Sequence, residues 1–224
     1  MRLWRAVLTW LSAVMIPLTL IFIGVLFLLT PIFLDLEYHM PGFPADDFGF
    51  SLSDRLKWAG LAQQYLANDA GLEFLGNLKF PNGTALYNER ELSHLQDVKK
   101  IVKPVMLIGY GSWIFLAGLT LLSYRGNKKW DPVFIQGLRS GGWITIGLLV
   151  LIGAFAITSF WNFFTLFHGL FFKGDSWLFL YSDTLIRLFP MRFWQDAFIM
   201  IGIIALAGSL AIVLGLKPID KKTN

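Results

Sequence analysis

Four long apolar runs divide the chain and restrict what it can fold into. They cover about residues 6–34, 101–124, 141–167 and 197–216. A helix of about 20 predominantly apolar residues crosses a bilayer, so each run is long enough to be a span. With 55% hydrophobic residues, 15% charged residues and a mean hydropathy of +0.59, an ordinary soluble domain is excluded. We therefore predict an all-α integral membrane protein with four transmembrane helices, forming a single membrane domain over residues 1–224.

A signal peptide is the alternative interpretation of the first run, because Arg2 and Arg5 precede it. Its apolar core is far longer than the ~7–15 residues of a signal h-region, and no small-x-small cleavage site follows. We expect an uncleaved first span. The chain has no cysteine, so disulfides, thiolate metal sites and a cysteine nucleophile are excluded.

Basic residues predict the orientation of the four spans. Nine lysines and arginines, against two aspartates, fall on the side of both termini: Arg2, Arg5, Arg125, Lys128, Lys129, Arg139, Lys217, Lys221 and Lys222. Loops above ~60 residues translocate largely regardless of their charge, so these short segments decide. We expect cytoplasmic termini and an external long loop. The net charge of +4 is divided between two sides of a membrane and does not indicate nucleic-acid binding.

Both external segments are expected to be structured. Residues 35–100 predict a small helical cap, with Ser53 capping a helix from Asp54 to about Asn68. Residues 168–196 mix aromatic residues with isolated charges, which is typical of a short amphipathic helix in the membrane interface.

A polar stretch, residues 88–99, stands directly before the second apolar run. Asn88 and Glu91 form a capping-box pattern, so a helix is expected to begin at Glu89 and to continue into the second span. Positions three and four apart share one side of a helix, which gathers Arg90, Glu91, His94 and Asp97. A histidine flanked by carboxylates can hold one tautomer and exchange protons near neutral pH. The alternative is a solvated, charged helix entry in which His94 has no role.

His168 stands at the outer end of the third run, as His94 does for the second, so the two imidazoles could meet across a helix bundle. The candidate site contains His94 and His168 as catalytic residues, Glu91, Asp97 and Asp183 as orienting carboxylates, and Arg90 and Lys99 as donors to an oxyanion. Two alternatives stay open. His168 could be satisfied by a backbone carbonyl, and the two cations could contact lipid headgroups.

Other sequence signatures of enzymes are weak or absent. Glu91 and His94 have the Glu-x-x-His spacing of bundle metal centres, but one such pair plus His168 is a weak signal for a metal-dependent hydrolase. There is no Gly-x-Ser-x-Gly elbow, no His-Glu-x-x-His and no phosphate-binding glycine loop. We predict neither a metal nor a cofactor.

Two long motifs carry a resemblance to a known family. They read Arg90-Glu91-Leu92-Ser93-His94-Leu95-Gln96-Asp97-Val98-Lys99 and Phe167-His168-Gly169-Leu170-Phe171-Phe172, followed by Trp177-Leu178-Phe179, Asp183-Thr184-Leu185-Ile186 and Phe189-Pro190. Over nearly its whole length the sequence resembles the Lit family of bacterial lipoprotein intramolecular transacylases.

The resemblance implies a reaction, a substrate and a location. The family moves the sn-2 acyl chain of a diacylglyceryl-modified lipoprotein onto the α-amine of the same N-terminal cysteine, which gives lyso-form lipoprotein. The implied partners are diacylated bacterial lipoproteins and membrane lipids, with no nucleic acid. The implied location is the bacterial plasma membrane, with the active site at the outer leaflet.

For this chemistry we expect His94, oriented by Glu91 or Asp97, to act as base on the amine. His168 would protonate the departing sn-2 oxygen or stabilise the oxyanion, and the two roles could be reversed. The main alternative is a non-catalytic membrane protein that binds lipids or lipoproteins in the same polar pocket.

Overall fold

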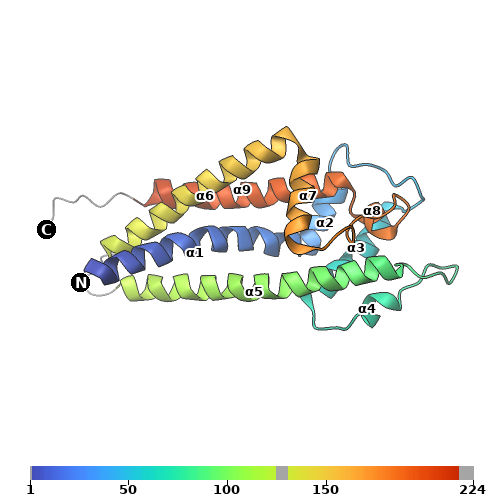
Figure 1. The fold of residues 1–224 in the computed structure, drawn as a ribbon, viewed down its shortest axis with the longest axis horizontal. Coiled ribbons are helices and arrows are strands. Elements are labelled where there is room, and N and C mark those ends of the chain that lie inside the picture. The colour runs from blue at the N-terminus through green and yellow to red at the C-terminus, as the bar shows by residue number, and fades with distance from the viewer. Residues whose placement is uncertain (1, 125–130, 217–224) are drawn as a thin grey trace. The chain divides into compact units, whose positions relative to one another are not determined.

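The computed structural model describes residues 2–124 and 131–216, and within them every named element of secondary structure is a helix (Figure 1). The helices are α1 (Arg2–Leu28), α2 (Pro31–Tyr38), α3 (Leu52–Ala67), α4 (Glu73–Gly76), α5 (Glu89–Ser123), α6 (Pro132–Thr158), α7 (Phe160–Phe171), α8 (Thr184–Leu188) and α9 (Met191–Gly215). Four of them are long and apolar enough to cross a membrane: Arg5–Leu28 of α1, and α5, α6 and α9. The predicted all-α, four-span membrane protein is confirmed.

The first predicted span, residues 6–34, is too long. Helix α1 ends at Leu28, and Thr30 caps a separate helix α2 that begins at Pro31. Proline is favoured at the first position of a helix, where its fixed φ suits the helix and its missing N–H costs no hydrogen bond.

The third predicted span, residues 141–167, is placed wrongly at both ends. Helix α6 begins at Pro132 and ends at Thr158, so His168 lies on another helix, α7. Ser159 has extended backbone, and its hydroxyl accepts a hydrogen bond from the Asn162 N–H. This N-cap ends one helix and starts the next.

Two further boundaries move by a few residues. Helix α9 begins at Met191, directly after Pro190, instead of near residue 197. Helix α3 is capped by Ser51 instead of Ser53, because Asp54 completes a capping box with Ser51.

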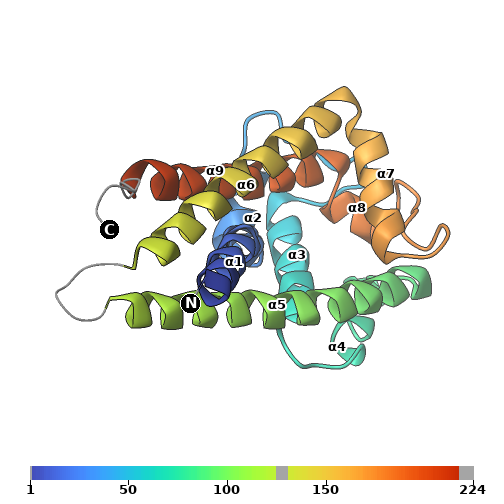
Figure 2. The same ribbon diagram turned by 60° about the vertical axis from the view of Figure 1, so that its left-hand side comes forward.

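The chain divides into two compact units. The first comprises Met1–Val25, Met106–Thr158 and Met200–Asn224, and the second comprises Leu26–Val105 and Ser159–Ile199. Helix α5 passes through both units without a break (Figure 1, Figure 2). The single membrane domain expected over residues 1–224 stays a prediction.

In the first unit, glycines let α6 pack closely on α1. A Cβ on Gly137 would lie 2.7 Å from the Ser12 Cβ, and one on Gly141 would lie 2.6 Å from the Ile16 Cβ and 2.8 Å from the Ala13 carbonyl oxygen. This spacing is the Gly-x-x-x-Gly pattern, which brings helix backbones together in membranes.

The second unit has its own hydrophobic core, which positions the candidate site. Its buried members are Trp58, Tyr65, Leu75, Leu86, Tyr87, Leu95, Leu185 and Leu188. They come from α3, α4, the segment directly before α5, the first turns of α5, and α8. Helix α3 also packs against α2. This core fixes the part of α5 that carries His94.

Candidate active site

The two histidines singled out in the sequence face each other within the second unit. The ring centroids of His94 on α5 and His168 on α7 are 6.4 Å apart, and the rings are inclined by only 18°. They are 74 positions apart in the sequence, so only the tertiary fold brings them together.

Backbone geometry fixes the state of the His168 ring. Its Nδ1 lies 2.9 Å from the Phe164 carbonyl oxygen, one turn earlier on α7. Because a carbonyl only accepts, the neutral ring carries its proton on Nδ1 and a lone pair on Nε2. Burial lowers the pKa of His168, although the hydrogen bond to Phe164 opposes this. The ring is therefore neutral at physiological pH and can accept a proton at Nε2. The backbone-carbonyl contact considered in the sequence analysis is present, and it supports this chemistry.

The His94 ring is half-buried among aromatic side chains. Phe172 lies 4.7 Å and Phe179 5.3 Å away, centroid to centroid. Its Nδ1 is buried, with no hydrogen-bond partner in residues 2–124 and 131–216. Unpartnered buried acceptors are less rare than unpartnered buried N–H groups, so Nδ1 is best assigned the lone pair and Nε2 the proton.

Glu91 supports the site through backbone contacts instead of holding an imidazole. Its Oε2 accepts a hydrogen bond from the Asn88 N–H at 2.8 Å, and the Glu91 N–H donates to Asn88 Oδ1 at 3.0 Å. The predicted capping box is thus confirmed. Its Oε1 accepts a hydrogen bond from the Leu185 N–H at 2.7 Å, so one buried carboxylate ties α8 to the start of α5. With both oxygens engaged by backbone N–H groups, Glu91 is not arranged as a metal ligand beside His94.

Asp97 lies one turn beyond His94 and belongs to a cavity of about 400 Å³. Its carboxylate pairs with Lys100 at 2.8 Å. The cavity is lined by Asp97, Lys100, Ile101, Phe171, Phe172, Lys173 and Ser176. Because Phe172 also contacts both imidazoles, this cavity opens beside the histidine pair.

Arg90 and Asp183 hold the segment between α7 and α8. The Arg90 guanidinium donates to the Asp175 carbonyl oxygen and pairs with the Asp175 carboxylate at 3.3 Å. Asp183 accepts hydrogen bonds from Asn88 Nδ2 at 3.1 Å and from the Leu180 N–H at 2.8 Å. Both residues position the segment that carries Phe179, and neither is bonded to an imidazole.

Lys99 is not brought to the histidines. Its ammonium group donates to the Ala70 carbonyl oxygen at 2.6 Å and to Asn68 Oδ1 at 3.2 Å, and it lies 3.9 Å from the centroid of the Tyr65 ring. These contacts make it a support for the segment after α3.

The aromatic walls of the site were not predicted from the sequence. Trp177 lies 4.6 Å and Phe164 4.0 Å from His168, centroid to centroid, and Phe172 and Phe179 surround His94. The only signal was the aromatic richness of residues 160–179, which equally suits a membrane interface.

Together these contacts give two adjacent imidazoles in complementary states, one with an open lone pair and one with an open N–H, between apolar walls. Such a pair can remove a proton from one atom of a bound substrate and supply a proton to another. Among the residues that the structure describes, no three His, Cys, Asp or Glu side chains gather as a metal site would require.

Comparisons with known proteins show the family and the fold of the chain. Residues 9–194 match the family model described as lipoprotein intramolecular transacylase Lit. A protein from Aquifex aeolicus (strain VF5), whose function is uncharacterised, is 33% identical over 186 residues, covering 82% of each chain.

A solved structure shares the fold. The membrane-integral lipoprotein intramolecular transacylase Lit from Bacillus cereus superposes with a TM-score of 0.61 over 95% of this chain and 94% of its own, at 19% identity.

Proposed function

This chain belongs to the lipoprotein intramolecular transacylase family Lit, and from that premise we propose that it converts diacylglyceryl lipoproteins into the lyso-form. The sn-2 acyl chain leaves the glyceryl oxygen and joins the α-amine of the same N-terminal cysteine. One C–O ester bond breaks and one C–N amide bond forms. The product is an isomer of the substrate, so no co-substrate is needed.

The single observation that carries this proposal is the 6.4 Å separation of the His94 and His168 rings. Acyl migration requires two proton transfers: the amine loses a proton, and the departing sn-2 oxygen gains one. Two imidazoles at this distance can serve the two atoms of one small reacting group.

The protonation states favour one division of roles. His168, with its proton fixed on Nδ1 by Phe164, is the base that takes the amine proton at Nε2. His94, neutral with its proton on Nε2, donates a hydrogen bond to the oxyanion. The proton that His168 took from the amine then passes to the departing sn-2 oxygen, so both rings end neutral. This reverses the assignment that we favoured from the sequence, where the order of the two histidines was left open.

The rest of the barrier is lowered by placement. Nucleophile and ester belong to one molecule, and holding them in contact contributes roughly 7–11 kcal/mol. The enzyme therefore needs no nucleophile of its own, which suits a chain without cysteine. We assign the cavity beside Phe172 to the glyceryl ester that reaches the histidines.

A binding protein without catalysis is the second candidate, and the contacts of its key cations disfavour it. It requires Arg90 and Lys99 to hold a headgroup, yet Arg90 is paired with Asp175, and Lys99 is bonded to Asn68 and Ala70.

The test is the reaction itself. A synthetic diacylglyceryl-cysteine lipopeptide, deuterated only in its sn-2 chain, is incubated with the purified protein. Because the product has the mass of the substrate, fragmentation in the mass spectrometer locates the label. We expect deuterium on the cysteine nitrogen. Label that stays on the glyceryl fragment, or appears as free fatty acid, rules out intramolecular transfer.

A further inference from the structure

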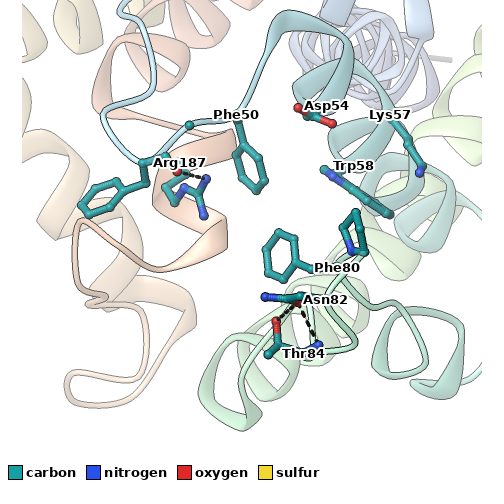
Figure 3. A pocket seen from close by; sticks show the side chains of 11 residues that line it. Phe50, Asp54, Lys57, Trp58, Phe80, Asn82, Thr84 and Arg187 are labelled. Carbon is teal, nitrogen blue, oxygen red and sulfur yellow. Dashed lines mark hydrogen bonds between the residues drawn. The ribbon is translucent and has the colours of Figure 1, made fainter.

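A second cavity, of about 450 Å³, lies in the same compact unit as the two histidines (Figure 3). Its aromatic wall consists of Phe48, Phe50, Trp58 and Phe80. The side chains come from the segment before α3, the first turns of α3, the turn before α5, and α8, so only the fold assembles them. Nothing in the proposed acyl transfer uses this cavity.

Arg187 of α8 builds one side of the cavity and is held firmly. Its Nη2 lies 3.0 Å from Asp46 Oδ2 and 3.2 Å from the Phe48 carbonyl oxygen, and its Cζ lies 3.5 Å from the centroid of the Phe50 ring. Burial acts to raise the pKa of Asp46, but hydrogen bonds from Arg187 and the Phe50 N–H keep it below its ordinary value, so the pair stays ionised. The wall is therefore formed before any ligand arrives.

Helix α8 connects this cavity to the catalytic helix. The Leu185 N–H donates to Glu91, one turn before His94, and Arg187 follows two residues later. Summing helical rises and side-chain lengths along this path places the cavity within roughly 20 Å of the histidines. An extended chain covers about 3.3–3.6 Å per residue, so roughly six residues bridge that distance.

The polar lining suits a polypeptide. Asp54 offers a carboxylate oxygen, while the Asn82 amide and the Lys57 ammonium offer donors beside the aromatic faces. Aromatic surfaces with a few acceptors and donors match a main chain that carries alternating N–H and C=O groups. We expect this cavity to bind a free ligand weakly. A ligand tethered at the reacting cysteine is present at an effective concentration in the millimolar range, so weak contacts suffice.

Resting on the proposed function, we propose that this cavity holds the polypeptide of the lipoprotein substrate a few residues after its lipid-modified cysteine. The cavity thus contributes to substrate affinity, while the histidines carry out the chemistry.

Because the chain has no natural cysteine, the cavity can be plugged at a single position. Asn82→Cys is labelled with a bulky fluorescein maleimide. Asn77→Cys, at another exposed asparagine, which ends α4 and does not line the cavity, is the matched control. Phe48→Ser, at a side chain 52% exposed, provides a second variant that does not depend on labelling.

Each protein is assayed with two diacylglyceryl-cysteine substrates, one with ten further residues and one with a single further residue. We expect plugging at Asn82 to raise KM for the long substrate about tenfold at unchanged kcat, and to leave the short substrate unaffected. Labelled Asn77→Cys behaves as wild type, and Phe48→Ser gives a smaller rise in the same direction.

Equal loss on both substrates would show that the cavity only supports the fold, and an unchanged KM on both would show that the substrate polypeptide does not enter it. Either result overturns the assignment. Failure of the unlabelled wild type to convert even the short substrate refutes the acyl transfer itself, and the cavity assignment falls with it.

Discussion

At the scale of single residues, the His168 ring owes its chemistry to one backbone carbonyl. The 2.9 Å contact with Phe164 decides which nitrogen is free to act. The buried Nδ1 of His94 decides the opposite state for its neighbour. Two chemically identical side chains thereby become an acceptor and a donor.

This assignment predicts distinct tautomers that can be measured without substrate. In protein with 15N-labelled histidine at pH 7.5, we expect His168 to show a protonated Nδ1 and His94 a protonated Nε2, because the carbonyl fixes the first and burial favours the second. Signals are assigned with His94→Gln and His168→Gln. Observation of the same tautomer in both rings would remove the proposed division of roles.

Glu37, on α2, makes folding depend on pH. Its side chain is 1% exposed, and neither carboxylate oxygen has a hydrogen-bond partner within the described residues. Burial, followed by the negative charge of Asp196, raises the pKa of Glu37 from 4.5 to about 7. A raised carboxyl pKa means that the folded state holds the proton more tightly, so stability falls as pH rises from about 4.5 to about 7.

We therefore expect Glu37→Gln to unfold at a higher temperature than wild type at pH 8, and the difference to shrink towards zero near pH 4.5. The shift corresponds to at most about 3 kcal/mol, reduced by any water that reaches the Glu37 carboxylate. Thermal unfolding in detergent at both pH values measures it. Asp35→Asn, at an exposed carboxylate on the same helix, should change little. A Glu37→Gln advantage that is equal at both pH values would point to packing instead of titration.

At the scale of elements, sequence reasoning found the apolar segments and misplaced several of their ends. Hydrophobic length predicts that a helix can cross a membrane, and the structure has four helices that are long and apolar enough to do so. Hydrophobic length carries no information on helix capping. The helix breaks at Thr30 and Ser159, which lie inside continuous apolar runs, were therefore not predicted. The Asn88–Glu91 box was predictable because both partners lie within one turn.

The site was predictable to the same local extent. His94 and His168 stand out because histidine is scarce and both are near the ends of apolar runs. The second contact of Glu91, to Leu185, joins residues 94 positions apart, and no short-range pattern contains it. The same holds for Phe172 and Phe179 around His94.

Close packing of α6 on α1 gives a test at this scale. Gly141→Leu would force a side chain against Ile16 and the Ala13 carbonyl oxygen, so we expect a loss of about 1–3 kcal/mol and a fall of several degrees in the unfolding temperature. Gly147→Leu, on the same helix with no atom within 4 Å of the added Cβ, is the matched control. Equal tolerance of both changes would contradict the packing.

At the scale of the whole molecule, the proposed orientation depends on charges that lie mostly outside the described residues: Arg125, Lys128, Lys129, Lys217, Lys221 and Lys222. The chain is a multi-pass membrane protein. We propose cytoplasmic termini and an active site at the outer leaflet, because basic residues are retained on the cytoplasmic side.

Single cysteines test this orientation directly. In intact cells, a membrane-impermeant maleimide should label Asn82→Cys, while Asp131→Cys should react only after permeabilisation. The reverse pattern would place the histidines on the cytoplasmic side and exclude lipoproteins at the outer leaflet as substrates.

The most direct test of the central claim compares lipoprotein N-termini from cells that carry wild type, His94→Ala, His168→Ala, the double variant, or His39→Ala as a control at an exposed histidine. With each imidazole removed, we expect lyso-form production to fall at least about hundredfold. Because the two rings act as one unit, the double variant should produce no less lyso-form lipoprotein than the less active of the two single variants. The His39→Ala cells should match wild type. Mass spectrometry that finds unchanged lyso-form lipoprotein in both single variants would contradict the account.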